Sequence, residues 1–184
     1  MEFLVKLEKL VAGWAKKVPH LPTAGQKWLA DNVWWIVLIG AILSGIGLLF
    51  AIGGLFVLIS LFGAVSAAYY APYAAVGITG ITILAAVISL VFLAARVVLM
   101  GSAIKPLKEK QKKGWVLLFI VWLLQAVAIV IDAVLSLSVV GFFMTILFGA
   151  IALAVTGYFL FEIHAQFGGA PKAAKKKTTK AKKA

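Results

Sequence analysis

The sequence predicts an all-α integral membrane protein, namely a four-helix transmembrane bundle with an N-terminal amphipathic helix at the membrane interface. Hydrophobic residues make up 64% of the 184 residues and the mean hydropathy is +1.08, whereas soluble domains are nearer half apolar. Two apolar blocks, residues 33–104 and 115–161, hold few charges, and each is too long for one span of about 20 residues. Lysine-rich segments flank both blocks and indicate how the chain crosses the membrane.

The three basic segments, residues 1–32, 105–113 and 167–184, carry five, five and seven lysines. Because such segments stay on the cytoplasmic side, each apolar block should cross the membrane an even number of times. Two crossings per block predict spans at about residues 33–61, 74–104, 115–136 and 139–166, with both termini in the cytoplasm. Three crossings in the first block would instead put the N-terminus and residues 105–113 on opposite sides.

Residues 1–24 are expected to form the interfacial helix and a linker. Apolar residues recur there with helical spacing and share one face, while the charged residues lie elsewhere; that face consists of Phe3, Leu7, Leu10, Val11 and Trp14. Such a helix lies in the plane of the membrane interface. The alternative is a helix that packs on the cytoplasmic face of the protein itself.

The transmembrane domain is expected to occupy residues 25–167. Asp31 or Asn32 is the expected N-cap of the first span, because both side chains can accept a hydrogen bond from free amide groups of a first turn. Tryptophans cluster at the cytoplasmic ends of the expected spans, where such rings act as interface anchors. These residues are Trp28, Trp34, Trp35 and Trp115.

The C-terminal segment, residues 168–184, is low in complexity and rich in lysine and alanine, so it is expected to be a disordered cytoplasmic tail. Each lysine near an anionic leaflet contributes about 1 kcal/mol, so the tail is expected to contact anionic inner-leaflet lipids. Contact with nucleic acid or ribosomes is an unspecific alternative, and a third is that the tail has no specific role. The lysines are Lys172, Lys175, Lys176, Lys177, Lys180, Lys182 and Lys183.

Small residues recur at helical spacing in the first and fourth spans. Such stripes let helices approach closely in lipid, either within one chain or between chains, so a homo-oligomer or another protein partner is also an open expectation. The predicted packing residues are Gly40, Ser44, Gly47 and Gly54 in the first span, and Gly141 and Gly149 in the fourth.

A few polar residues interrupt the spans. Arg96 shares a helix face with Thr82 and Ser89, whereas Gln125 and Asp132 share a face of the third span. At about 1.5 Å per residue, Arg96, Gln125 and Glu162 lie roughly 12, 15 and 9 Å from the cytoplasmic ends of their helices. We therefore expect Glu162 to neutralise Arg96 and Gln125 to hydrogen-bond it, because an unpaired charge inside a membrane is unfavourable.

Two alternatives to that network remain. Arg96 could extend toward the cytoplasmic headgroups without a partner. Asp132 lies about 25 Å along its span, near the outer boundary, and is expected to be out of reach of Arg96.

Catalysis is not expected. The chain has no cysteine, and its two histidines, His20 and His164, stand in no known metal-ligating or catalytic motif. No cofactor or metal is therefore expected. The remaining function classes are a structural or interaction protein that contacts anionic lipids or a partner through its basic segments, and, as the alternative, a small transporter or proton- or ion-conducting protein. The alternative would use a polar line through the bundle formed by Asp132, Gln125, Arg96, Glu162 and His164.

Three stretches, ADNVWWIVLIGAILSGIG, AIKPLKEKQKKGW and YFLFEI, carry one resemblance. Together they resemble a family of small four-span membrane proteins of reduced-genome bacteria, over most of residues 25–167. The resemblance implies the same four-span fold and a bacterial plasma membrane. It implies no activity.

Overall fold

The computed structural model describes residues 2–15, 18–68, 73–136 and 138–167, and these residues form helices and no strands. The helices follow one another with short connections. They are α1 (Glu2–Ala15), α2 (Thr23–Ala68), α3 (Tyr73–Lys108), α4 (Lys112–Val134), α5 (Val139–Glu162) and the 3₁₀-helix η1 (His164–Phe167). The predicted all-helical class is therefore confirmed.

Four of these helices are long and apolar enough to cross a membrane. The shortest, α4, has 23 residues, which at about 1.5 Å per residue exceeds the roughly 30 Å of a hydrocarbon core. The apolar stretches are Thr23–Leu61, Gly80–Lys108, Lys112–Val134 and Val139–Glu162. The predicted number of long apolar helices is thus correct.

The start of α2 differs from the expectation. The helix begins at Thr23 rather than near residue 33, so neither Asp31 nor Asn32 is an N-cap. Asp31 instead forms an ion pair with Lys110 of the α3–α4 connection. The Asn32 side-chain amide donates a 2.8 Å hydrogen bond to the carbonyl of Trp28 within the helix. A polar side chain that can cap a helix can also hydrogen-bond to a backbone carbonyl inside one.

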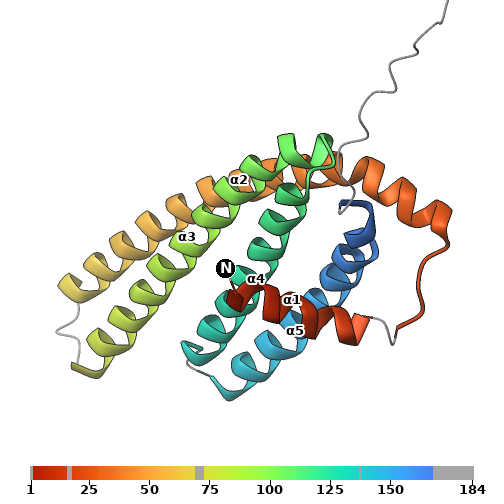
Figure 1. Ribbon diagram of the computed structural model, residues 1–184. Coiled ribbons are helices and arrows are strands. Elements are labelled where there is room, and N and C mark those ends of the chain that lie inside the picture. Colours follow the sequence, from red (N-terminus) through yellow and green to blue (C-terminus); the bar gives the residue numbers. More distant parts are fainter. Residues whose placement is uncertain (1, 16–17, 69–72, 137, 168–184) are drawn as a thin grey trace, which may run out of the picture.

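Each long helix packs on the next one along the chain: α2 on α3, α3 on α4 and α4 on α5. Figure 1 shows that the α2–α3 and α4–α5 hairpins spread apart from a shared end, where the short α3–α4 connection lies. Helix α1 crosses beside α5, although the two helices lie far apart in the sequence. The long helices therefore pack as neighbours along the chain, and η1 contacts α2 at the shared end, an arrangement compatible with the predicted helical bundle.

The buried core lies at the shared end. It joins residues of α2, α3, α4, α5 and η1, among them Ala30, Ala103, Trp115, Ile163 and Phe167. Trp115 is fully buried, which corrects its expected place as an interface anchor. Trp28 and Trp35 are half or more exposed, as an anchor would be. Trp115, expected at the membrane interface, is therefore a central residue of the protein's buried core.

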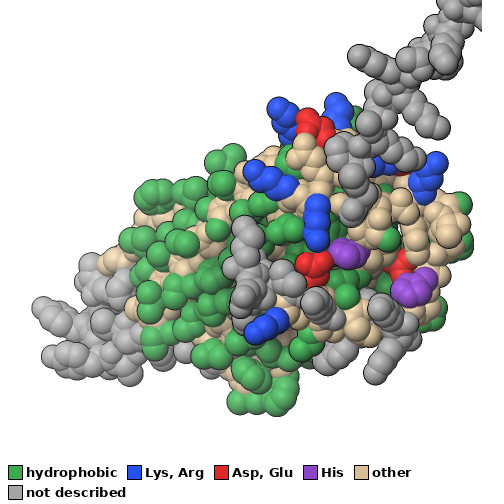
Figure 2. All heavy atoms as spheres, viewed as in Figure 1, with side chains coloured by type: hydrophobic (Ala, Val, Ile, Leu, Met, Phe, Trp, Pro, Cys, Tyr) green, Lys and Arg blue, Asp and Glu red, His purple; other side chains and the backbone are tan. Residues whose placement is uncertain are grey.

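Away from this end, large apolar side chains cover the surface. Leu49 and Phe50 of α2 are 70% and 77% exposed, and Phe148 of α5 is 64% exposed. In Figure 2 hydrophobic side chains cover the part formed by the spreading helices, whereas most of the charged side chains in this view gather at the shared end. The molecule is thus divided into an apolar body and a charged end.

The predicted packing glycines fall into two groups. A Cβ atom on Gly149 would meet the side chain of Ile129 of α4, and one on Gly40 would lie 2.9 Å from Met100 of α3. Gly141 faces Ser136 and Ser138 in the turn before α5. In contrast, a Cβ on Gly47 or Gly54 would meet nothing within 4 Å, and Ser44 is half-buried. The α5 glycines and Gly40 therefore pack within the chain, and the outer half of the α2 stripe does not.

Two backbone segments approach closely at Gly114, a residue that no pattern singled out. A Cβ there would lie 2.7 Å from the backbone nitrogen of Leu107 and 2.9 Å from the carbonyl carbon of Pro106. Backbone atoms cannot move aside as the end of a flexible side chain can. Gly114 thus permits the tight reversal that brings α4 back along α3.

We predict that Gly114→Ala lowers the free energy of unfolding by about 1–3 kcal/mol, the usual effect of overpacking. The matched control is Gly101→Ala in α3, which meets no neighbour and should be neutral or stabilising by up to about 1 kcal/mol through helix propensity. Thermal unfolding of both variants in one detergent measures the difference. Equal melting temperatures would show that the α3–α4 reversal tolerates a side chain.

Candidate functional site

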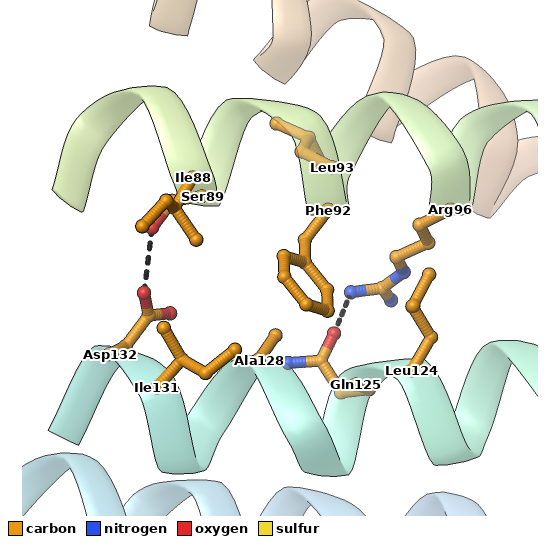
Figure 3. Close-up of a pocket in the computed structure, with 10 residues that line it drawn as sticks. All are labelled: Ile88, Ser89, Phe92, Leu93, Arg96, Leu124, Gln125, Ala128, Ile131 and Asp132. Carbon is orange, nitrogen blue, oxygen red and sulfur yellow. Dashed lines mark hydrogen bonds between the residues drawn. The ribbon is translucent and has the colours of Figure 1, made fainter. Parts of the chain in front are cut away.

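A cavity of about 190 Å³ lies between α3 and α4. Figure 3 shows its two polar pairs, each with one residue from either helix. Ser89 and Arg96 come from α3, and Gln125 and Asp132 come from α4; these are the residues that helical spacing put on one face of each span. The predicted polar faces of the two helices therefore meet.

Arg96 forms the cationic end of the cavity. Its Nη1 donates a hydrogen bond to Oε1 of Gln125, as expected from their matched depths. The Nε atom of Arg96 is buried and has no hydrogen-bond acceptor in the described part of the chain. An arginine has five N–H donors in a fixed plane, and a neutral amide oxygen accepts only part of that capacity.

Asp132 forms the anionic end. Its Oδ1 accepts a 2.6 Å hydrogen bond from the hydroxyl of Ser89. Apolar side chains line the cavity between the two ends, including those of Phe92, Ala128 and Ile131. The cavity thus separates one positive from one negative charge by an apolar middle (Figure 3).

The expected ion pair between Arg96 and Glu162 is not formed. Glu162 is 6% exposed and lies in a second polar cluster. Its carboxylate accepts hydrogen bonds from Nδ1 of His20 at 2.7 Å, from the Leu21 amide at 3.0 Å and from Nε2 of Gln26 at 2.9 Å. Three donors from the segment before and at the start of α2 thus satisfy this carboxylate, where the sequence suggested only an arginine.

Two more contacts hold the N-terminal region on α5 and η1. The Tyr158 hydroxyl donates to the carbonyl of Pro19 at 2.9 Å, and Nε2 of His164 contacts Oε1 of Glu8 in α1 at 2.9 Å. Both histidines of the chain therefore face glutamates, across the junction of the N-terminal segment with the end of α5. We call the contacts of Glu162, Tyr158 and His164 the N-terminal clamp.

Lysines surround the shared end of the helices. Lys110 pairs with Asp31, and the Lys108 ammonium group lies 5.0 Å from the centre of the Trp34 ring, a favourable cation–π geometry. Lys105, Lys112 and Lys113 are exposed. The predicted lipid-contact lysines of residues 168–184 lie outside the described residues. The basic end available for contact is therefore built by α2, α3, α4 and the connection at residues 109–111.

The two polar clusters offer charged and hydrogen-bonding groups. Across the described residues, no group of three or more His, Asp or Glu side chains could hold a metal ion. Both described histidine–glutamate pairs join separate segments of the chain. The cavity offers charged groups and hydrogen-bonding groups at its two ends.

Sequence reasoning missed His20, Gln26 and the Leu21 amide as partners of Glu162. Residues 18–22 show no hydrophobic period, so no pattern indicated that they fold back onto α5. Ser89 was placed on the correct face, but its bond to Asp132 depends on the register of α3 against α4. Only the assembled structure gives that register.

Comparisons of the chain with models of protein families, with curated proteins and with solved structures find no match. Function is therefore inferred from the residues and their geometry alone.

We predict that Glu162→Gln opens the N-terminal clamp. The amide retains the volume of the carboxylate, but it has no charge and one oxygen acceptor fewer. It therefore binds the three donors more weakly than the carboxylate does. Hydrogen–deuterium exchange of the Leu21 amide should accelerate about tenfold, which corresponds to about 1.4 kcal/mol.

The control for this prediction is Asp132→Asn, the same chemical change in a carboxylate of the other cluster. It should leave exchange at Leu21 as in the wild type. Unchanged exchange in Glu162→Gln would contradict the clamp.

Proposed function

We propose that the protein is a multi-pass protein of the plasma membrane with both termini in the cytoplasm, where its basic end contacts anionic lipids. In this proposal it acts as a structural or interaction protein and not as an enzyme. The N-terminal amphipathic helix and the lysine-rich tail would add contacts on the same side.

The apolar body supports the membrane part of the proposal. Side chains such as Phe50, Phe56 and Leu49 are more than two-thirds exposed on α2, and patches of this extent would drive aggregation in water. In lipid the same surface is favourably solvated, and the backbone groups inside a helix bond to one another, as a membrane interior requires.

The single observation that carries the proposal is the distribution of charge. Among α2, α3, α4, α5 and their described connections, every lysine lies at the shared end: Lys27, Lys105, Lys108, Lys110, Lys112 and Lys113. At the opposite end the only charged residue in the described ranges is Asp132, two residues before α4 ends. Lysines confined to one end of apolar helices are typical of the cytoplasmic side and attract anionic headgroups.

A partner chain is part of this proposal. The open positions at Gly47 and Gly54 on α2 would allow close approach of another helix, from a second copy or from a different protein. The lysine-rich tail, residues 168–184, would contact the inner leaflet or, as the less specific option, nucleic acid.

The alternative, a small transporter or ion-conducting protein, is less well supported by the geometry. A continuous path would need Glu162 in line with Arg96, Gln125 and Asp132. Glu162 instead binds His20, Leu21 and Gln26, so the polar residues form two separate clusters. The cavity between α3 and α4 supports binding of a small ligand more directly than conduction.

The topology can be tested by cysteine labelling, because the chain has no cysteine of its own. A membrane-impermeant maleimide added to intact cells should label Ser138→Cys, in the α4–α5 connection. It should label Gln111→Cys, in the α3–α4 connection, only after the cells are opened. The reverse pattern, or equal labelling of both variants in intact cells, would contradict the proposed orientation.

Lipid contact can be tested by exchanging Lys105, Lys108, Lys112 and Lys113 together for glutamine. Each lysine near an anionic surface contributes about 1 kcal/mol, so retention of phosphatidylglycerol, measured by native mass spectrometry, should fall by at least about tenfold. Retention of phosphatidylcholine should not change.

The matched control for the lipid experiment carries arginine at the same four positions and so keeps the charge. It should retain phosphatidylglycerol as the wild type does. Loss in the arginine variant, or full retention in the glutamine variant, would contradict lipid binding at this end.

A further inference from the structure

We infer that the cavity between α3 and α4 binds a small zwitterion of the amino-acid type, with its carboxylate on Arg96 and Gln125 and its ammonium group on Asp132. This inference goes beyond the proposed lipid contact and does not depend on it. The cavity lies between two helices, whereas the lipid-contacting lysines lie at their ends.

The cationic end has capacity for a carboxylate. No ion pair joins Arg96 to a carboxylate in the described part of the chain; its hydrogen-bond acceptor there is the neutral Oε1 of Gln125. Its Nε is buried without an acceptor, which is costly for a charged donor. A carboxylate matches the planar guanidinium with two parallel hydrogen bonds. The Gln125 amide nitrogen faces along the cavity toward Ala128 (Figure 3) and could donate to the same carboxylate.

The anionic end has capacity for an ammonium group. Oδ1 of Asp132 accepts from the Ser89 hydroxyl, and within the described residues no hydrogen-bond donor is assigned to Oδ2. An ammonium group carries three donors and no acceptor, so it fits a carboxylate and the oxygen of a neighbouring hydroxyl. Asp132 and Ser89 come from different helices and present these oxygens at one end of the cavity (Figure 3).

The spacing between the ends limits the length of the ligand. Ser89 and Arg96 are seven residues apart on α3, as are Gln125 and Asp132 on α4, which is about 10.5 Å along a helix. This is the backbone separation of the two polar pairs, so a ligand with one hydrogen bond at each end must be short. A carboxylate and an ammonium group joined by a few carbon atoms meet this requirement.

The walls and the volume agree with such a ligand. Phe92, Leu93 and Ile131 line the cavity between its charged ends and would contact a short carbon chain. The cavity of about 190 Å³ is smaller than the roughly 300–1,000 Å³ of pockets for drug-sized molecules. A peptide or a lipid headgroup with its acyl chains would be too large.

The balance of charge favours a zwitterion over a simple anion or cation. The lining already holds one positive and one negative side chain, so a zwitterion satisfies both and brings no net charge between the apolar helices. A monoanion would leave Asp132 unpaired, and a monocation would leave Arg96 unpaired. The cost is larger at Arg96, whose Nε is buried, than at Asp132, which is exposed near the end of α4.

The test uses the full chain in phosphatidylcholine nanodiscs and three probes of similar size: β-alanine, propionate and propylammonium. Isothermal titration calorimetry should show saturable binding of β-alanine and at least about tenfold weaker binding of each singly charged probe. Absence of saturable β-alanine binding would overturn the inference. Equal affinity for propionate would also overturn it, because the site would then be one for anions.

Variants assign the two ends. Arg96→Gln and Asp132→Asn should each weaken β-alanine binding by at least about tenfold, while Asp31→Asn, a carboxylate change outside the cavity, should have no effect. Arg96→Lys keeps the charge and should bind more tightly than Arg96→Gln, provided that both variants elute as the wild type in size exclusion. Wild-type affinity in both Arg96→Gln and Asp132→Asn would overturn the assignment. Phosphatidylglycerol retention by these variants should be unchanged, which separates this site from the basic end.

Discussion

The fold depends on the burial of Trp115 at the start of α4. Its indole Nε1 donates a 2.8 Å hydrogen bond to the carbonyl of Leu160 near the end of α5, and its ring stacks on Phe119 and meets Phe161 and His164 edge-on. The side chain is fully buried, so its donor would be strongly unfavourable without that carbonyl. One residue thus fixes the register of α4 against α5 and supplies the surface on which α2, α3 and η1 pack.

That register determines where both polar clusters lie. With α4 and α5 aligned at Trp115, the last turn of α5 presents Glu162 to the segment before α2, and the N-terminal clamp can form. Ten residues beyond Trp115, about three helical turns, Gln125 faces α3 and meets Arg96. A second indole contact, from Trp122 to the carbonyl of Leu153 at 3.0 Å, keeps the two helices in register between these clusters.

Sequence periodicity predicted the parts of this structure that depend on one helix at a time. It gave the number of long apolar helices, and it put Ser89 with Arg96 and Gln125 with Asp132 because a shared face requires only a spacing of seven residues. Periodicity did not predict the partner of Glu162, because two segments of the chain could supply it. Arg96 and Glu162 have matching depths, but depth says nothing about the direction in which a side chain points. The donors that take Glu162 come from an aperiodic, proline-containing segment that carries no signal.

The same limit applies to Trp115, whose position at a helix end is equally typical of an anchor and of a core residue. What separates the two is Gly114. A Cβ atom there would lie 2.7 Å from the backbone nitrogen of Leu107 and 2.9 Å from the carbonyl carbon of Pro106, so only glycine lets α4 start this close to the end of α3. Ala128 is a second small residue of α4 that faces α3. It lies three residues after Gln125 and four before Asp132, on the cavity wall, where a glutamate would reach toward Arg96 and fill the space. If the helix interface served only to neutralise Arg96, a glutamate at this position would stabilise it. Alanine instead leaves Arg96 without an ion pair and leaves the cavity open, as the inferred binding site requires.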